Sequence, residues 1–263
     1  MSYADGDVQW MRAGRGVIHE EMWDLRESDW AHKKIEIFQL WVNLPSKKKS
    51  LPPSLHVLKD NDIPNIDCGN GISVKVICGS LVDAESSVKN TDSSTGPGSL
   101  KIPDSVTDGP GSVISESPVS ILHLSMQGPS SSTIINTEAG CTTTVYVRRG
   151  SMILDNGEKV EIRPGDCVIF RPPDSSSVRG VTSPNSISSS SSSGSSSSSN
   201  SAQQSVTLTA GMAGLDALVL TGKPLNERVI FQGPLVLADE DSFRKSAEGF
   251  NRYDTYFTYH EIA

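Results

Sequence analysis

The stretch SMILDNGEKVEIRPGDCVIF, residues 151–170, decides the fold class. It holds three short runs rich in apolar and β-branched residues, with a turn signal between each pair of runs. Asn156-Gly157 is typical of a tight hairpin turn, and Pro164-Gly165 is typical of a second turn. Strand, turn, strand, turn, strand predicts an antiparallel β-sandwich or barrel.

The same pattern extends to both sides of this stretch. Residues 119–126 and 142–147 precede it with strand-like runs, and residues 206–208 and 215–220 resume the pattern after it. The second half of the chain is therefore predicted to be β-rich.

The first 80 residues also predict strands. Residues 72–78 alternate with period two, which places Ile72, Val74 and Val76 on one buried face. Residues 35–44 mix β-branched and aromatic side chains over a strand-sized length and stop at Pro45. We expect a second, N-terminal β-domain here.

Two polar segments interrupt these domains. The hydrophobic fraction of 36% is below the ~45–50% usual for globular domains, so part of the chain lies outside a core. We predict a partial N-terminal domain over 1–82, a polar linker or insertion over 83–118, and a C-terminal domain over 119–263. Within the last, the serine-rich stretch 183–205 is predicted to be a disordered loop, because it cannot bury enough apolar area.

One helix is predicted near the C-terminus. It spans residues 239–250, with Asp241 as its N-cap and Phe243, Ala247 and Phe250 at helical spacing.

Composition argues against several classes of protein. The net charge of −8 and the lack of a dense Lys/Arg tract predict no direct nucleic-acid binding, and Lys47-Lys48-Lys49 is interpreted as a solvated loop. No apolar run approaches the ~18–20 residues of a membrane helix, so no membrane association is expected. The N-terminus has no basic and apolar leader, which predicts a cytoplasmic or nuclear location. Four cysteines without a C-x-x-C pair predict buried thiols.

The residues that carry chemistry lie in GRGVIHEEM, residues 14–22. On an extended strand His19 and Glu21 project to the same face, so an imidazole nitrogen and a carboxylate could converge on one metal ion. The alternative is a surface His-Glu pair. A zincin motif is excluded because Trp23 stands where its second histidine would be, and a zinc-deaminase motif because no P-C-x-x-C follows.

Residues 7–22, DVQWMRAGRGVIHEEM, closely resemble a signature of the pirin family of the cupin superfamily. Residues 38–45 resemble the next strand of that family, and residues 222–227 and 232–236 resemble its C-terminal signature. The resemblance implies an all-β protein of two antiparallel jelly-roll (cupin) barrels. Here the N-terminal barrel is expected to be incomplete, and a short C-terminal helix is added.

The resemblance also implies one non-haem iron in the first barrel, held by three histidines and one glutamate. His19 and Glu21 match the last two ligands, while the other two belong to an H-P-H-x-G-F-E-T type motif expected upstream of Asp7 and absent from this chain. Iron is therefore expected to be weakly bound or absent. The remaining histidines, predicted to be surface or packing residues, are His32, His56, His123 and His260.

Three functions are compatible with the residues. The family resemblance implies quercetin 2,3-dioxygenase activity, an oxidoreductase reaction on a flavonol-like small molecule with His19 and Glu21 acting through iron. It equally implies a non-enzymatic nuclear co-regulator that binds a transcription-factor partner. The third is an inactive truncated product, in which Trp10, Ile18, Trp41 and Val42 would be partly uncovered.

Overall fold

The computed structural model describes nine ranges of the chain. These are residues 2–22, 36–79, 98–99, 115–155, 157–172, 186–189, 204–232, 235–242 and 244–245. The chain divides into two compact units. One unit combines Met1–Val57 with Leu225–Ala263, and the other spans Leu58–Pro224.

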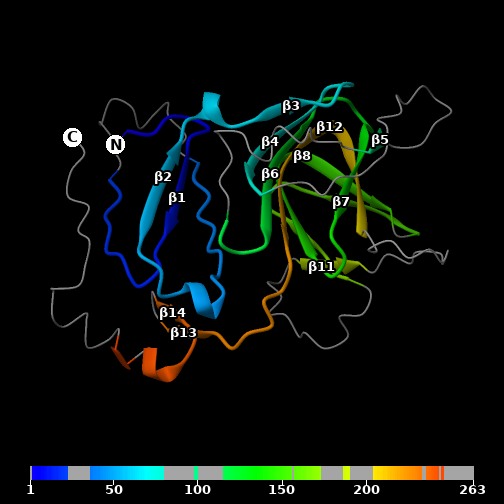
Figure 1. Ribbon diagram of the computed structural model, residues 1–263. Helices are drawn as coiled ribbons and strands as arrows, with labels where there is room; N and C mark the ends of the chain where they lie inside the picture. Colours follow the sequence, from blue (N-terminus) through cyan, green and yellow to red (C-terminus); the bar gives the residue numbers. More distant parts are fainter. Residues whose placement is uncertain are drawn as a thin grey trace. The chain divides into compact units, whose positions relative to one another are not determined.

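The unit Leu58–Pro224 is built on one ten-stranded sheet (Figure 1). Its main path runs β11-β10-β8-β12-β6-β4-β3, with β7 on β12, β9 on β8 and β5 on β7. The pairings are antiparallel except for β10 with β11 and β5 with β7. The strands are β3 (Asn65–Asp67), β4 (Ile72–Cys78), β5 (Gly98–Ser99), β6 (Val119–Met126), β7 (Ser132–Thr137), β8 (Thr142–Asp155), β9 (Lys159–Ile162), β10 (Cys167–Phe170), β11 (Ser186–Ser189) and β12 (Gln204–Gly222).

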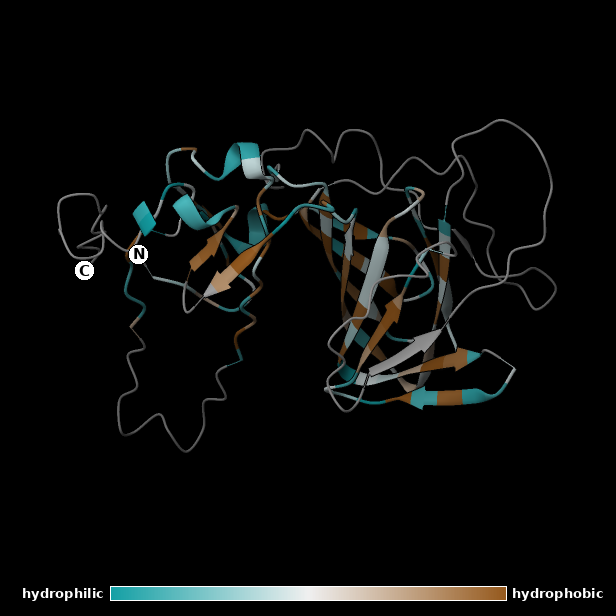
Figure 2. Cartoon of the chain, turned by 90° about the horizontal axis from the view of Figure 1, so that it is seen from below, coloured by the Kyte–Doolittle hydropathy of each residue, from teal (hydrophilic) through white to brown (hydrophobic). Residues whose placement is uncertain are grey.

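Period-two alternation creates the core that this sheet encloses. In β4 buried and half-buried residues alternate throughout, and Val74 and Val76 are each 1% exposed. The same side of β6 contributes Leu122, Leu124 and Met126 to one continuous cluster. Figure 2 shows hydrophobic residues along strands of the large sheet. Because residues from β4, β6, β7, β8, β9, β10 and β12 all enter that cluster, the sheet closes around a single core.

Two glycines let the longest strands bend without ending. Gly150 in β8 and Gly214 in β12 have φ of 70° and 81°, and a Cβ at Gly150 would lie 2.2 Å from the Gly214 carbonyl oxygen. The register of β12 against β8 shifts between Ala210 and Leu215. The separate strands predicted within 142–154 and within 206–220 are therefore two continuous strands, because bulged glycine positions bend the ladder instead of breaking it.

The other unit holds smaller pieces of sheet. β1 (Val8–Arg12) pairs with β2 (Ser54–Leu58), and β13 (Ile230–Gln232) pairs with β14 (Leu235–Leu237). A single 3-10 turn, η1 (Ser46–Lys48), lies between β1 and β2 in the chain; a second, η2 (Asp60–Asp62), follows β2 and belongs to the unit Leu58–Pro224. The predicted all-β class with a short C-terminal helix is confirmed.

The C-terminal helix has a different N-cap from the one predicted. Residues 240–242 and 244–245 are helical, and the Ser242 backbone N–H donates to the Asp239 carboxylate at 2.7 Å. Asp239 is thus the N-cap, and Asp241 lies inside the first turn. That hydrogen bond holds the pKa of Asp239 below its usual value. Residues 246–250 of the predicted helix lie outside the described residues.

The strand predicted over 35–44 is wrong for residues 36–44. These residues form no strand, and Ile37, Leu40 and Trp41 are 53%, 41% and 57% exposed. Strand propensity measures the fit of a side chain to a pleated, half-buried surface. Among the described residues no strand pairs with this segment, so that surface is lacking.

The polar segments contain some regular structure. Residues 186–189, predicted to belong to a disordered loop over 183–205, form β11 beside β10, and β12 already begins at Gln204. Within the predicted linker, residues 98–99 form β5 and Ser117 is 5% exposed. Backbone pairing explains this, since a strand added to an edge needs no apolar side chains. The rest of both predicted segments lies outside the described residues.

The two compact units do not coincide with the predicted boundaries at residues 82 and 118. β4 pairs with β6 over Ile72–Cys78 because its apolar face belongs to the same core, so β3 and β4 join the strands that follow them in the chain. The segment after Leu225 instead joins the N-terminal residues. The division into cupin domains at 1–82, 83–118 and 119–263 stays a prediction.

Candidate metal site

A glycine turn prepares the segment that carries the predicted metal ligands. Gly14 has φ of 54°, and a Cβ there would lie 2.0 Å from the Leu51 carbonyl oxygen. The same oxygen accepts a hydrogen bond from the Arg15 backbone N–H at 2.9 Å. The Gly16 N–H closes the turn on Ala13 at 2.9 Å. Glycine is required at position 14 by both the backbone angle and the close approach.

His19 and Glu21 lie together directly after this turn. The His19 Nδ1 atom is 3.9 Å from the Glu21 Oε1 atom, and the two side chains are 31% and 45% exposed. Residues 19–22 form no strand, so the proximity does not come from the extended strand that the sequence predicted. One imidazole nitrogen and one carboxylate oxygen are donors that suit iron, and both are accessible.

The described residues add no third ligand to this pair. They contain no group of three or more His, Cys, Asp or Glu side chains that could hold a metal ion. His56 is exposed on β2, as predicted for a surface residue, while His32 and His260 lie outside the described residues. The donor set therefore fits iron in its chemistry and supplies two coordination positions.

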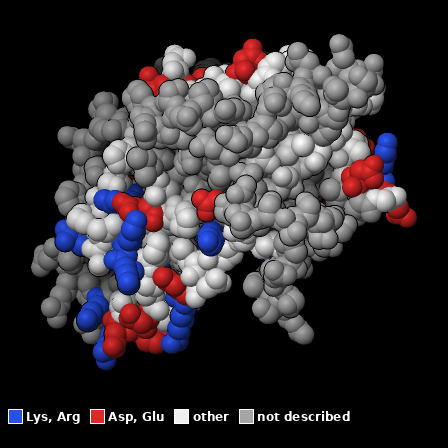
Figure 3. Space-filling view, turned by 45° about the vertical axis from the view of Figure 1, so that its right-hand side comes forward, with Lys and Arg blue, Asp and Glu red and all other residues white. Residues whose placement is uncertain are grey.

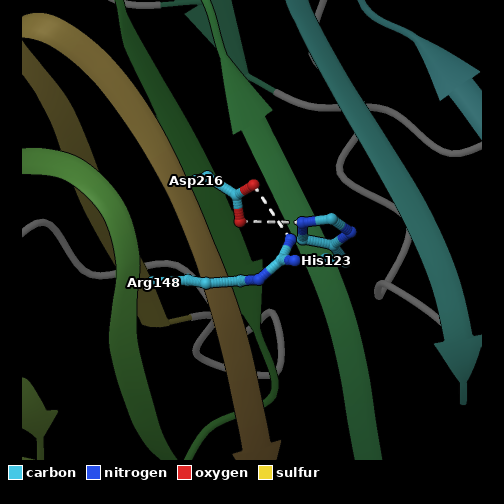
Figure 4. A network of polar contacts seen from close by, with 3 residues as sticks. All are labelled: His123, Arg148 and Asp216. Atoms are coloured by element: carbon cyan, nitrogen blue, oxygen red, sulfur yellow. Dashed lines mark hydrogen bonds and ion pairs between the residues drawn. The ribbon is translucent and has the colours of Figure 1, made fainter. Parts of the chain in front are cut away.

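His123 belongs to a polar network on the outer face of the closed sheet (Figure 4). Its neighbours Leu122 and Leu124 enter the core, so the imidazole points the other way. The Asp216 carboxylate lies 2.9 Å from His123 Nε2 and accepts from Arg148 at 3.1 Å. Burial opposes ionisation of Asp216, but His123 and Arg148 outweigh it, so the pKa of Asp216 lies below its usual value. The sequence predicted a surface or packing residue here, and the His123 side chain is a partly exposed member of this network.

The cysteines are free thiols in protected surroundings. Cys78 and Cys141 are buried, and Cys68 and Cys167 are half-buried. Burial raises the pKa of Cys68 and of Cys78 to about 11 in each case. These thiols stay protonated near neutral pH and are poor nucleophiles and metal ligands.

A contact that the sequence did not predict joins two segments that lie far apart in the sequence. The Glu227 Oε2 atom accepts hydrogen bonds from the Ser46 backbone N–H at 2.6 Å and from its hydroxyl at 2.7 Å. These bonds, followed by the nearby charges of Lys49 and Lys47, hold the pKa of Glu227 below its usual value. Phe231 lies against Trp41, with ring centroids 5.7 Å apart. No local pattern relates residues 181 positions apart, so only the motif order hinted at this contact.

Charge is mixed over the described surface. Figure 3 shows Lys and Arg side chains interspersed with Asp and Glu on the face in view. Lys49 is more enclosed than the predicted solvated loop implies, because it donates to Asn43 and burial lowers its pKa. In the part of the chain that is described, no helix is long and apolar enough to cross a membrane.

Comparison with known proteins shows similarity to one family in the N-terminal part of the chain. The family model described as Pirin matches residues 1–42, which include the glycine turn, His19 and Glu21. Human pirin is 42% identical over 83 residues, covering 32% of this chain and 26% of the human protein. Over these residues the chain is similar to pirins. The matched range includes Gly14–Met22, which the sequence comparison with that family had singled out.

Longer similarities cover most of this chain. A Pseudomonas aeruginosa protein, whose name proposes quercetin 2,3-dioxygenase activity, is 25% identical over 246 residues. That alignment covers 93% of this chain and 66% of the relative, so the chain spans about two thirds of its length. A solved quercetin 2,3-dioxygenase from Acinetobacter baumannii matches with a TM-score of 0.58 and 22% identity over 95% of this chain and 67% of that one. This likeness shows a shared fold.

Proposed function

We propose that this chain is a pirin-like, iron-binding cupin protein that acts as a quercetin 2,3-dioxygenase-type oxidoreductase on a flavonol-like small molecule. The observation that carries the proposal is the 3.9 Å approach of His19 Nδ1 to Glu21 Oε1 behind the glycine turn. The pair falls inside the residues matched by the pirin family. The substrate class follows the printed names of the Pseudomonas and Acinetobacter proteins.

His19 and Glu21 are the residues that would hold the iron. His19 would bind iron(II) through a ring nitrogen in its neutral form, and Glu21 would add a carboxylate that offsets one positive charge. Bound iron would supply Lewis-acid and one-electron chemistry toward a hydroxylated aromatic ligand and O2. Both side chains are one third to one half exposed, so ligand and solvent reach them from outside.

Two protein donors predict a weak site. Affinity rises with the number and geometry of the ligands, and the described residues supply two donors, from His19 and Glu21. We therefore expect the purified chain to carry less than one iron per molecule. Tightly held, stoichiometric iron would show that this count of ligands is wrong.

The experiment combines metal loading with oxygen uptake. The chain is titrated with iron(II) under anaerobic conditions, and oxygen uptake is then measured with quercetin. His19→Ala is expected to abolish both metal binding and quercetin-dependent uptake. His56→Ala is the matched control, because that histidine is exposed on β2 and remote in sequence from the motif. Uptake that survives His19→Ala contradicts the proposal.

A further inference from the structure

Glu227 lies in the C-terminal stretch that resembles the pirin family. Its carboxylate contacts the N-terminal segment of the same compact unit. A single oxygen of Glu227 accepts two hydrogen bonds from Ser46, at 2.6 Å and 2.7 Å. Lys49 and Lys47 add favourable charge to the same carboxylate. Glu227 therefore binds the first residue of η1, although its side chain is not buried.

A second set of bonds joins η1 to Leu51. The Lys48 N–H donates to the Pro45 carbonyl at 2.8 Å, and the Leu51 N–H donates to the Lys48 carbonyl at 3.1 Å. These short-range bonds fix the direction in which the Leu51 carbonyl points. Fixing η1 through Ser46 thus also fixes Leu51.

Leu51 in turn fixes the glycine turn before His19. Its carbonyl oxygen accepts from the Arg15 N–H at 2.9 Å, and the missing side chain of Gly14 makes that approach possible. The adjacent Pro52 carbonyl accepts from Arg12 Nε at 3.0 Å. Only three residues separate Arg15 from His19, so the orientation of the metal pair depends on this turn.

We infer that Glu227 is a positioning residue for the His19–Glu21 pair, acting through η1 and Leu51. The inference rests on the proposed iron function for its chemical meaning, but the contacts that carry it do not involve a metal. It gives the C-terminal signature a role in the site, because that segment contributes the carboxylate which holds η1 in place.

Hydrogen exchange and metal affinity test the inference in the full chain. Glu227→Gln keeps the shape of the side chain and removes its charge. Glu240→Gln is the matched control, since Glu240 is 69% exposed and contacts Arg228 at 3.4 Å. Surface charge contacts are weak, so we expect about twofold to fivefold faster exchange of the Arg15 and Gly16 amides in Glu227→Gln. Amide exchange in β6 should stay unchanged, which would show that the unit Leu58–Pro224 is still folded.

The metal measurement separates positioning from a local structural role. Cobalt(II), used as a spectroscopic substitute for iron(II), should bind about twofold to fivefold more weakly to Glu227→Gln than to Glu240→Gln. Glu227→Asp, which keeps the charge, should restore part of that affinity. Unchanged Arg15 and Gly16 exchange in Glu227→Gln overturns the inference, and so does unchanged metal affinity. A parent chain that binds no metal contradicts the proposed function instead, and amide exchange then decides the inference alone.

Discussion

The two compact units use apolar residues in opposite ways. In the unit Leu58–Pro224 large apolar side chains enter one core, and Leu124, Val145 and Leu208 are fully buried. Among the described residues of the other unit no large apolar side chain is buried, and Trp41 and Phe231 are 57% and 66% exposed. The same residue types therefore stabilise one unit by burial and contribute little burial to the other.

This difference shows that a hydrophobic run is buried in a core only when it forms a strand that pairs with neighbouring strands. Residues 72–78 and 36–44 both satisfy the strand pattern in the sequence. The first pairs with β3 and β6 and is buried on one face, whereas the second has no strand partner among the described residues. The proposed chemistry lies in the less buried unit, where small contacts at turns fix the geometry.

The largest loss of stability is expected in the core of the unit Leu58–Pro224. Leu124→Ala removes a side chain that is 0% exposed and leaves a cavity, so we expect a loss of about 2–5 kcal/mol in the free energy of unfolding. Chemical denaturation followed by circular dichroism measures it. Ser125→Ala on the opposite face of β6 is the control and should change stability little. Equal effects of the two changes would contradict the assignment of the core face.

A smaller effect is expected at the glycine turn. Gly14→Ala forces a Cβ to within 2.0 Å of the Leu51 carbonyl oxygen at a φ of 54°, so we expect about 1–3 kcal/mol of local destabilisation and weaker metal binding. Gly16→Ala meets no atom within 4 Å and serves as the control, with strain from its φ of 127° alone. Exchange of the Arg15 amide, with the barrel as internal reference, measures the effect. A larger loss in Gly16→Ala than in Gly14→Ala would contradict the close approach.

Much of the barrel could be predicted from the sequence, because strand alternation and turn residues are local signals. Residues 72–78 and 119–126 were predicted with the bounds that the structure shows, and the turn at Pro164-Gly165 also holds, with Gly165 at φ of 91°. β7 was missed, since its Ser and Thr residues weaken the apolar pattern, although Thr133 and Thr137 are buried.

The candidate site was predictable only in part, and for a different reason. His19 and Glu21 are two positions apart in the chain, so their proximity is a local property that a motif can carry. The Ser46–Glu227 and His123–Asp216 contacts join residues 181 and 93 positions apart. Such pairs form only when the whole sheet has its native register, or when the C-terminal segment packs beside the N-terminal one. Neither arrangement leaves a pattern in a single sequence.

The outer network of the barrel should make a moderate, pH-dependent contribution. The pKa of Asp216 lies below its usual value, so its contribution to stability is complete above that usual value and is lost as pH falls through the lower native pKa. Asp216→Asn should cost about 1–3 kcal/mol at neutral pH and flatten this acid dependence. Denaturation between pH 2 and pH 7 measures it. Ser125→Ala should keep the parent slope, and a parent-like slope in Asp216→Asn would contradict the ionised network.

The smallest effect is expected where apolar residues are exposed. Trp41→Ala removes a larger side chain than Leu124→Ala does, yet Trp41 is 57% exposed and its described ring contact is with Phe231 at 5.7 Å. An aromatic pair contributes about 0.5–1.5 kcal/mol when it is well packed, and exposure of both rings places this pair near the lower limit. Chemical denaturation of Trp41→Ala, Phe231→Ala and the double variant measures the coupling between the rings. A cost that matches Leu124→Ala would show that Trp41 is packed like a core residue and would remove the contrast between the two units.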